Sequence, residues 1–102
     1  MTQIINASTI ISMEITCDPN KRNQTIEDRG LDFMDAAYIF MGRHFTIEDN
    51  RKDYGEIRQI TVGFLQERMM IVGWVQRGDS RHVFTMRKAN EREINKYRER
   101  LE

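Results

Sequence analysis

The sequence predicts one α+β domain, in which four to five strands form an antiparallel sheet, two helices lie in the N-terminal part and one helix lies at the C-terminus. Three observations predict this class. The chain has 102 residues, which suits a single small domain. Apolar residues alternate in several segments, as in strands, and recur every three to four positions in others, as in helices. Four alternating segments follow one another with short connections, which favours antiparallel pairing.

Charge is unevenly distributed, although the formal net charge is zero. Residues 1–50 carry 4 Lys/Arg and 8 Asp/Glu, whereas residues 51–102 carry 12 and 8. The C-terminal half can therefore meet an anion and the N-terminal half a basic protein, but solvated surface charge explains either imbalance equally well. The single Cys17 excludes an internal disulfide and a cysteine-based zinc cluster. With no signal-peptide pattern and no long apolar run, these features predict a cytoplasmic protein.

The first predicted element is a strand over residues 13–17, which alternate. Residues 1–12 have no clear period, and Met13 is a candidate alternative start. Under that hypothesis the first 12 residues are a dispensable extension of a domain that otherwise spans residues 1–102.

Two helices are predicted next. Asp18 can accept a hydrogen bond from a free first-turn amide, Pro19 suits the first helical position, and Gly30 can end the helix in a left-handed conformation. Asp32 can cap the second helix, which stops at Gly42. One apolar stripe at helical spacing faces a core and consists of Phe33, Ala36, Ala37 and Phe40.

The middle of the chain predicts three strands. Residues 44–47 alternate and indicate a strand, which is followed by a charged loop over residues 48–55. The clearest strands are residues 57–64 and 69–75, with residues 66–68 between them as a hairpin turn.

The segment IVGWV at residues 71–75 is apolar on both faces, so it is either a central strand covered on each side or a strand with one face open to a partner. Residues 76–80 predict a turn and residues 81–87 the last strand. Asn90 and Glu93 stand at the spacing of a capping box and begin the last helix. Its apolar stripe consists of Ile94, Tyr97 and Leu101.

The last strand holds the most informative candidates. Strand alternation places four residues on one face: Arg81, Val83, Thr85 and Arg87. His82, Phe84 and Met86 then lie on the other face, where we expect Phe84 and Met86 in the core. The two arginines would lie about 20 Å apart, a distance that a polyanion spans but one small anion does not. Lys88 follows at the strand exit. An arginine fork suits phosphate, and a solvated strand face is the equal alternative.

Other candidates lie outside this strand. Arg58 and Glu56 begin the preceding hairpin, where a surface ion pair is the plain alternative. Lys21 lies in the first turn of a helix, where the helix dipole disfavours a cation, and this position hints at another use. We interpret Tyr97 as a core residue with a solvated hydroxyl.

The sequence predicts neither a metal nor a cofactor. It contains no phosphate-cradling glycine loop, no His-x-x-x-His pair and no nucleophile elbow. His44 and His82 are isolated from each other and from other ligand types. We therefore interpret each as a strand residue with a local hydrogen bond.

Two motifs together resemble the signatures of BrnT-type toxins. CDPNKRNQTIEDRGLDF followed by MDAAYIF matches the N-terminal signature through Asp18, Pro19, Lys21, Asn23, Gly30, Phe33 and Ala36-Ala37. The C-terminal signature is matched by Arg81, Thr85-Met86-Arg87-Lys88-Ala89, Asn90, Glu93 and Tyr97. Glu56, Arg58 and Gly63 fall at the family's middle positions. The resemblance covers residues 13 to about 100, and the paired motifs are more specific than either alone.

The resemblance implies a ribonuclease toxin with a RelE-like α+β fold. It implies neutralisation by an antitoxin, BrnA, which carries a ribbon-helix-helix DNA-binding portion, and a complex that represses its own operon. DNA would thus be contacted only through the antitoxin. The family usually has Lys-His before the helix-ending glycine, whereas this sequence has Asp28-Arg29, so any role of that histidine is missing here.

With this resemblance, we predict a metal-independent endoribonuclease that cleaves single-stranded or loosely held RNA and inhibits translation. Arginines would stabilise the charge that develops on the phosphate, and Glu56 or Tyr97 would transfer protons. The predicted catalytic residues are Arg58, Arg81, Arg87, Glu56 and Tyr97. The predicted RNA-binding residues are Lys21, Thr85 and Lys88.

Two other hypotheses stay open. A catalytically weakened homologue could act mainly as an antitoxin-binding module and operon co-repressor. An unrelated nucleic-acid-binding domain is the third hypothesis, and zero net charge and the lack of interleaved aromatic platforms argue against it.

Overall fold

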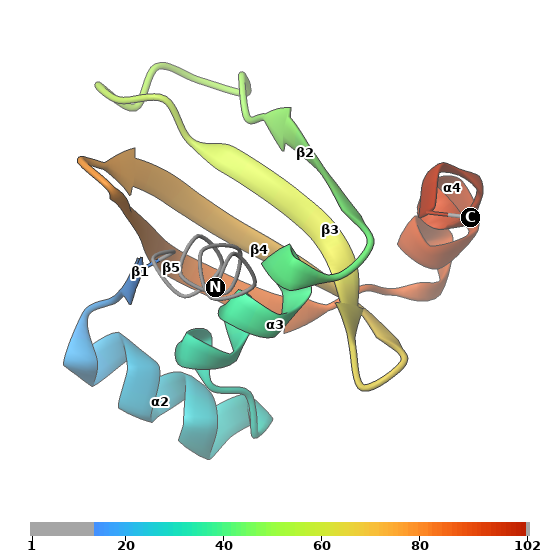
Figure 1. Cartoon of the computed structure of the whole chain (residues 1–102), viewed down its shortest axis with the longest axis horizontal. Helices are drawn as coiled ribbons and strands as arrows, with labels where there is room; N and C mark the ends of the chain where they lie inside the picture. The colour runs from blue at the N-terminus through green and yellow to red at the C-terminus, as the bar shows by residue number, and fades with distance from the viewer. Residues whose placement is uncertain (1–13, 102) are drawn as a thin grey trace, which may run out of the picture.

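The structure, a computed structural model, describes residues 14–101, so the predicted extension over residues 1–12 lies outside the described part. Its five strands form one sheet in the order β1-β5-β4-β3-β2 (Figure 1). The described elements, in chain order, are β1 (Glu14–Thr16), α2 (Pro19–Arg29), η1 (Phe33–Asp35), α3 (Ala36–Met41), β2 (His44–Glu48), β3 (Gln59–Leu65), β4 (Arg68–Arg77), β5 (Ser80–Lys88) and α4 (Glu91–Leu101).

The sheet is mixed, so the prediction of an antiparallel sheet was wrong for one strand pair. β2, β3, β4 and β5 pair antiparallel in sequence order, as predicted. β1 instead runs parallel to β5, with Glu14 opposite Ser80 and Thr16 opposite His82. The strand pair that differs is the one without a short connection, because two α-helices, the 3-10 turn η1 and three strands separate β1 from β5.

The predicted helix caps are present, but the second helix differs from the prediction. Asp18 accepts a hydrogen bond from the Asn20 amide at 2.9 Å, and Gly30 ends α2 with φ of 70°. Asp32 caps a single 3-10 turn, η1, rather than an α-helix, and the α-helix begins only at Ala36. The predicted apolar stripe nevertheless faces the core, with Phe33, Ala36 and Phe40 buried and Ala37 partly buried, because these residues still fall on one side of the combined η1–α3 segment.

The sheet has a core on each face. α2, η1 and α3 lie together on one side, and α4 lies apart from them beside the β2–β3 side of the sheet (Figure 1). The larger core, on the α3 side, includes Phe33, Ile39, Val72, Trp74, Val83 and Met86. The smaller core, on the α4 side, consists of Val62, Met69, Ile71 and Leu101, with Ile94 and Tyr97 packed against it. β4 is therefore a central strand covered on both faces. We call these two sides of the sheet the α3 face and the α4 face.

β5 contains a β-bulge that changes which side chains share a face. Gly73 pairs with Thr85 and Trp74 pairs with Val83, so Phe84 is an extra residue on β5. On one side of the bulge Val83 points to the α3 face, and on the other side Met86 does the same, although three positions separate them. A bulge therefore shifts the alternation by one residue.

The predicted faces of the last strand were wrong for this reason. Arg81 and Val83 lie on the α3 face, whereas Arg87 reaches α4 on the opposite face. Val72 and Trp74 point to the α3 face, so Gly73 between them faces the α4 side. A Cβ on Gly73 would touch Thr85 and Phe84, and these two side chains therefore also lie on the α4 side. Met86 is in the core as predicted, but Phe84 is only half-buried.

Among residues 14–101, no helix has the length and apolar character of a membrane span.

The bulge leaves too little room for a side chain at Gly73. A Cβ on Gly73 would lie 2.7 Å from Thr85 Cγ2 and 2.8 Å from the Phe84 ring. We expect Gly73→Ala to lower the free energy of unfolding by about 1–3 kcal/mol, measured by urea denaturation. Gly42→Ala is the matched control, because a Cβ there meets its nearest atom at 3.7 Å. Equal stability of the two variants would contradict this account of the bulge.

Candidate functional site

The α4 face brings together four of the eight predicted site residues. Arg87 and Thr85 come from β5 after the bulge, and Tyr97 comes from α4. Arg58 directly precedes β3 and contacts the Phe84 ring, which lies on the same face. These residues share a surface because the bulge turns the last third of β5 toward α4.

A groove of about 300 Å³ lies on this face between the β2–β3 loop and α4. Its base is apolar, formed by Ile60 and Ile71, and its walls carry polar and charged groups. The groove thus combines an apolar base with cations. The remaining lining residues are Ile47, Glu48, Asp49, Asn50, Arg51, Arg87, Glu93 and Tyr97.

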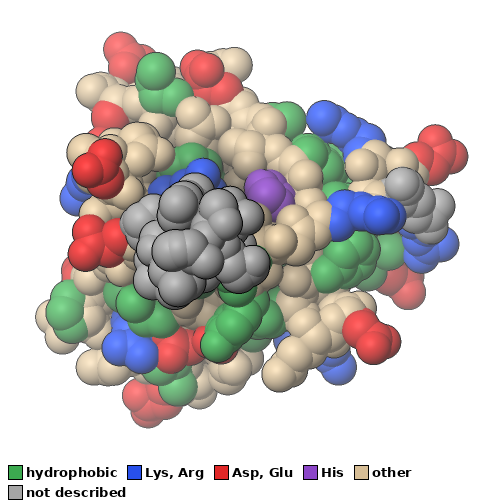
Figure 2. All heavy atoms as spheres, viewed as in Figure 1, with side chains coloured by type: hydrophobic (Ala, Val, Ile, Leu, Met, Phe, Trp, Pro, Cys, Tyr) green, Lys and Arg blue, Asp and Glu red, His purple; other side chains and the backbone are tan. Residues whose placement is uncertain are grey.

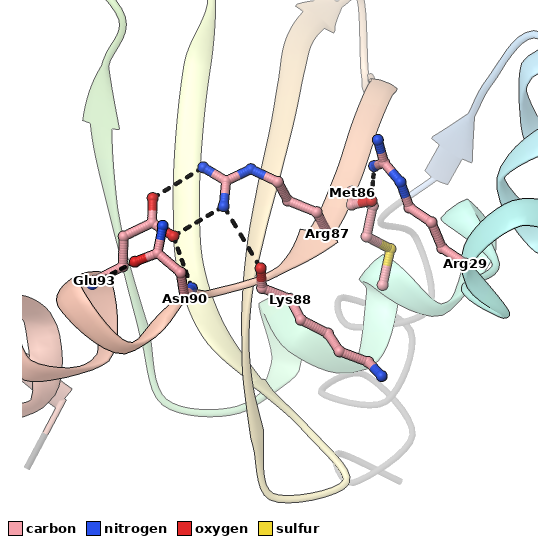
Figure 3. A network of polar contacts seen from close by, with 6 residues as sticks. All are labelled: Arg29, Met86, Arg87, Lys88, Asn90 and Glu93. Carbon is pink, nitrogen blue, oxygen red and sulfur yellow. Dashed lines mark hydrogen bonds and ion pairs between the residues drawn. The ribbon is translucent and has the colours of Figure 1, made fainter.

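Arg87 is held in place by Glu93. Its guanidinium donates two parallel hydrogen bonds to the Glu93 carboxylate, at 2.8 and 2.9 Å. Glu93 also accepts a bond from the Asn90 amide, while its own amide donates to Asn90 Oδ1, so the predicted capping box is present (Figure 3). The bonds from Arg87 lower the pKa of Glu93 from 4.5 to about 2. The start of α4 therefore fixes the direction of Arg87.

A second arginine of the groove, Arg51, was not predicted. It forms the same kind of pair with Asp49, with hydrogen bonds of 2.8 and 2.9 Å. These bonds lower the pKa of Asp49 from 3.8 to about 2. The sequence marked residues 48–55 only as a charged loop, because nothing in it shows that this loop folds over the groove. The sequence feature that could have indicated this ion pair is that Asp49 stands two positions before Arg51.

Arg58 lies between two aromatic rings. Its guanidinium carbon is 4.0 Å from the centre of the Tyr54 ring and 4.5 Å from the centre of the Phe84 ring. Among the described residues, its Nε is the only buried side-chain nitrogen or oxygen without a hydrogen-bond partner. Lys21 Nζ lies 5.9 Å from the same Phe84 ring, so α2 brings a second cation to this point. Both predicted cations thus meet at the bulge, held by cation–π contacts.

Glu56 lies near Arg58 in sequence but pairs with a different arginine. Its carboxylate is 3.6 Å from the Arg77 guanidinium, and both side chains are about half exposed. Such a pair contributes little to stability. Glu56 is therefore free to exchange partners, but it does not line the groove that holds Arg87 and Tyr97.

Arg81 and Lys88 do not join these residues. Arg81 lies on the α3 face, 4.4 Å from the Phe40 ring centre and 4.7 Å from that of Trp74. Burial there lowers its pKa. Lys88 points away from Arg87 (Figure 3) and lines two hollows, one on the α3 side with Arg29 and Met70 and one between the β3–β4 turn and α4. The prediction that Arg81 and Arg87 share a face was wrong.

The histidines have structural hydrogen bonds. His44 Nδ1 lies 2.8 Å from the Gly42 carbonyl oxygen, as a local bond was predicted. His82 Nδ1 lies 2.9 Å from Thr16 Oγ1, which joins β5 to β1 instead. Burial lowers the pKa of His82 and also raises that of the Cys17 thiol. Over residues 14–101, no three His, Cys, Asp or Glu side chains are placed to hold a metal ion.

Comparison with protein families identifies the class of this domain. Residues 17–93 match the model described as "Ribonuclease toxin, BrnT, of type II toxin-antitoxin system". The chain is thus a toxin of the type II class, in which an antitoxin partner and an RNA target are implied. Since the match covers well over half of the chain, it belongs to the BrnT family of ribonuclease toxins. A comparison with curated proteins found no match. The matched segment includes Arg58, Arg87 and Glu93 and ends before Tyr97.

The two arginine–carboxylate pairs predict acid sensitivity. Glu93 and Asp49 have folded pKa values near 2, below their ordinary values of 4.5 and 3.8. Folding thus favours their ionised forms, and the stability they contribute is complete above about pH 5 and is lost as the pH falls toward about 2.

Substitution of Glu93 tests this dependence. We expect Glu93→Gln to cost roughly 1 kcal/mol or less at neutral pH, and to lose less stability than the parent protein between about pH 5 and pH 2.5 in urea titrations. Glu91→Gln, an exposed carboxylate in the same helical turn, is the control and should follow the parent. Parallel curves for all three proteins would refute the role of Glu93.

Proposed function

We propose that this protein is a metal-independent endoribonuclease with a RelE-like fold and that RNA binds along the α4 face. The observation that supports this most is the convergence of Arg58 and Arg87 on that face, each with its guanidinium oriented by neighbours. Along β4, their pairing positions are separated by about four residues, or roughly 13 Å. That spacing fits an extended polyanion better than one small ion.

The reaction follows from what RNA offers. A base removes the proton of a 2′-hydroxyl, the 2′-oxygen attacks the adjacent phosphorus, the bond from phosphorus to the 5′-oxygen breaks, and that oxygen takes up a proton. Arg87 and Arg58 would bind different phosphates of the same RNA, and the arginine at the reacting phosphate would stabilise the charge that grows on it. Their rigid forks suit phosphate oxygens because two N–H groups point the same way.

The proton transfers need two further groups. Tyr97 lines the groove beside Arg87 and is the residue we favour as proton donor to the leaving oxygen. Glu56, at the Arg58 end, is the alternative proton-transfer group, and it would accept the proton of a 2′-hydroxyl held beside Arg58 after leaving its weak pair with Arg77. Lys21 and Thr85 would contact flanking RNA. Glu93 acts through Arg87 and is a positioning residue.

In the cell, RNA cleavage would inhibit translation. A BrnA-like antitoxin with a ribbon-helix-helix portion would neutralise the chain, and the complex would bind operator DNA through the antitoxin. The support for this part is membership of a type II toxin–antitoxin family. We further propose that residues 1–102 form one domain, which acts in the cytoplasm.

An RNA cleavage assay in EDTA tests the proposed site. Purified protein without antitoxin should degrade RNA, and Arg87→Ala and Arg58→Ala should each lower the rate by about a hundredfold. Arg92→Ala, an exposed arginine of α4, is the matched control and should leave the rate unchanged. Arg81→Lys should retain activity within about threefold, because Arg81 faces the other side of the sheet and lysine keeps its cation–π contact. Intact RNA, or an Arg81 effect as large as that of Arg87, would refute the proposal.

A catalytically weakened homologue is the second candidate function. It is favoured by one observation, that Arg51 and Arg87 already have carboxylate partners inside the protein, so RNA must compete with Asp49 and Glu93. In addition, Arg29, which stands where the family usually has histidine, donates to the Met86 carbonyl oxygen at 2.8 Å.

Expression in a bacterial host without antitoxin separates the two candidates. The nuclease predicts growth arrest that Arg87→Ala relieves, while the Arg92→Ala control still arrests growth. A chain that leaves growth unaffected but still binds the product of its neighbouring antitoxin gene supports the binding module.

A further inference from the structure

A large apolar groove lies on the molecule outside the proposed RNA site. It has a volume of about 720 Å³ and runs between the β3–β4 turn and α4. Its apolar lining consists of Phe64, Met69, Ala89, Ile94 and Leu101. Phe64 is 39% exposed, an unusual position for a phenylalanine. We call this feature the hairpin–α4 groove. An apolar concavity of this size at the surface is typical of a site for another molecule.

Cations surround the hairpin–α4 groove. Four of its lining residues are basic and only Glu67 is acidic; the basic residues are Arg43, Arg68, Lys88 and Arg98. They come from four different segments of the chain, so the fold gathers them at this end of the molecule. Figure 2 shows hydrophobic side chains on this side of the molecule with Lys and Arg side chains next to them. The groove therefore has an apolar base and a positive rim.

α4 separates this groove from the proposed RNA site. Glu93 and Tyr97, four positions apart, line the RNA groove, whereas Ile94, Arg98 and Leu101 line the hairpin–α4 groove. Residues three and four positions apart fall on one side of a helix. One helix thus presents two neighbouring stripes to two different sites. An occupant of the hairpin–α4 groove can therefore bind the helix without contacting Arg87.

We propose that the hairpin–α4 groove binds an amphipathic helix with acidic flanks, supplied by a protein partner. Apolar side chains at i, i+3, i+4 and i+7 would enter the base of the groove, and carboxylates beside them would meet the rim. Because this chain is a type II toxin, the partner of this chemistry is its antitoxin, and that identification rests on the proposed function. The antitoxin would then bind the toxin at this groove, through apolar contacts with the base and ion pairs with the rim.

Other occupants fit the groove less well. RNA would meet the cations, but an apolar base that offers one aromatic ring gives its bases little to stack on. The chain's own N-terminal residues 1–13 contain no Asp or Glu to match the rim. Charge complementarity and an apolar base together favour an acidic amphipathic segment.

Two synthetic peptides test the proposal on the full-length chain. One is an amphipathic helix of about 18 residues with leucine at the core positions and glutamate beside them, and the other has lysine in place of each glutamate. Fluorescence anisotropy would measure their dissociation constants. We expect the acidic peptide to bind about tenfold more tightly than the basic one. The cations of the rim would attract the acidic peptide as it approaches and would pair with its glutamates once it is bound.

Variants of the rim and base locate the binding. Arg98→Glu should weaken the acidic peptide about fivefold, with Arg92→Glu on the same helix as the unchanged control. Arg68→Glu combined with Arg98→Glu should bring the affinity of the basic peptide above that of the acidic one. Phe64→Asp should abolish measurable binding of both. These residues lie outside the proposed RNA site, so RNA cleavage by the variants should match the parent.

The outcomes separate this proposal from the nuclease. Equal binding of the two peptides, or no effect of the double variant, would overturn the groove proposal even if RNA is cleaved. Charge-selective binding that the double variant reverses would uphold it even if RNA stays intact. Displacement of the acidic peptide by single-stranded RNA would assign the groove to nucleic acid instead. A dimer in sedimentation experiments that Arg98→Glu dissociates would assign it to a second copy of the chain.

Discussion

The β-bulge at Phe84 is the constraint on which the rest of the structure depends. One extra residue in β5 lets Val83 and Met86 both enter the core on the α3 face. After the bulge, each side chain of β5 therefore lies on the opposite face from the one that strict alternation predicts. Arg81 is thereby placed against Phe40 and Trp74, while Arg87 is placed against α4. β5 thus carries one arginine on each face of the sheet. Arg81 packs against aromatic rings, and Arg87 lines the groove.

The bulge also determines what lies beside it. The Phe84 ring covers Gly73 and receives Arg58 from the adjacent hairpin and Lys21 from α2. Arginines on this face are held by neighbours of two kinds, carboxylates for Arg51 and Arg87 and aromatic rings for Arg58. A ring orients the guanidinium without neutralising it, whereas a carboxylate does both. Of Arg51, Arg58 and Arg87, Arg58 is therefore the one whose positive charge is not neutralised by a carboxylate.

Sequence patterns predicted what is decided locally. Helix caps act over two or three positions, so Asp18, Gly30 and the Asn90–Glu93 box were all correctly predicted. The parallel pairing of β1 with β5 joins residues 66 positions apart, as in the Thr16–His82 bond, and no local pattern encodes it. The bulge was missed because it shifts the alternation without a glycine or proline on its own strand; the Gly73 that accommodates it lies on the neighbouring strand. That error placed Arg81 with Arg87. The groove residues Asp49 and Arg51 were missed because a loop's position over a sheet is a tertiary property.

The bond from Arg29 to the Met86 carbonyl has a consequence for how partners can approach. Among residues 14–101, β1 pairs with β5 only from Ser80 to His82, and no described strand pairs with the rest of this edge. Unpaired edges invite strand addition by other chains. By donating to a carbonyl oxygen of this edge, Arg29 fills the acceptor that an added strand would need. This bond disfavours strand addition at Met86, whereas β2 is the other outer strand of the sheet.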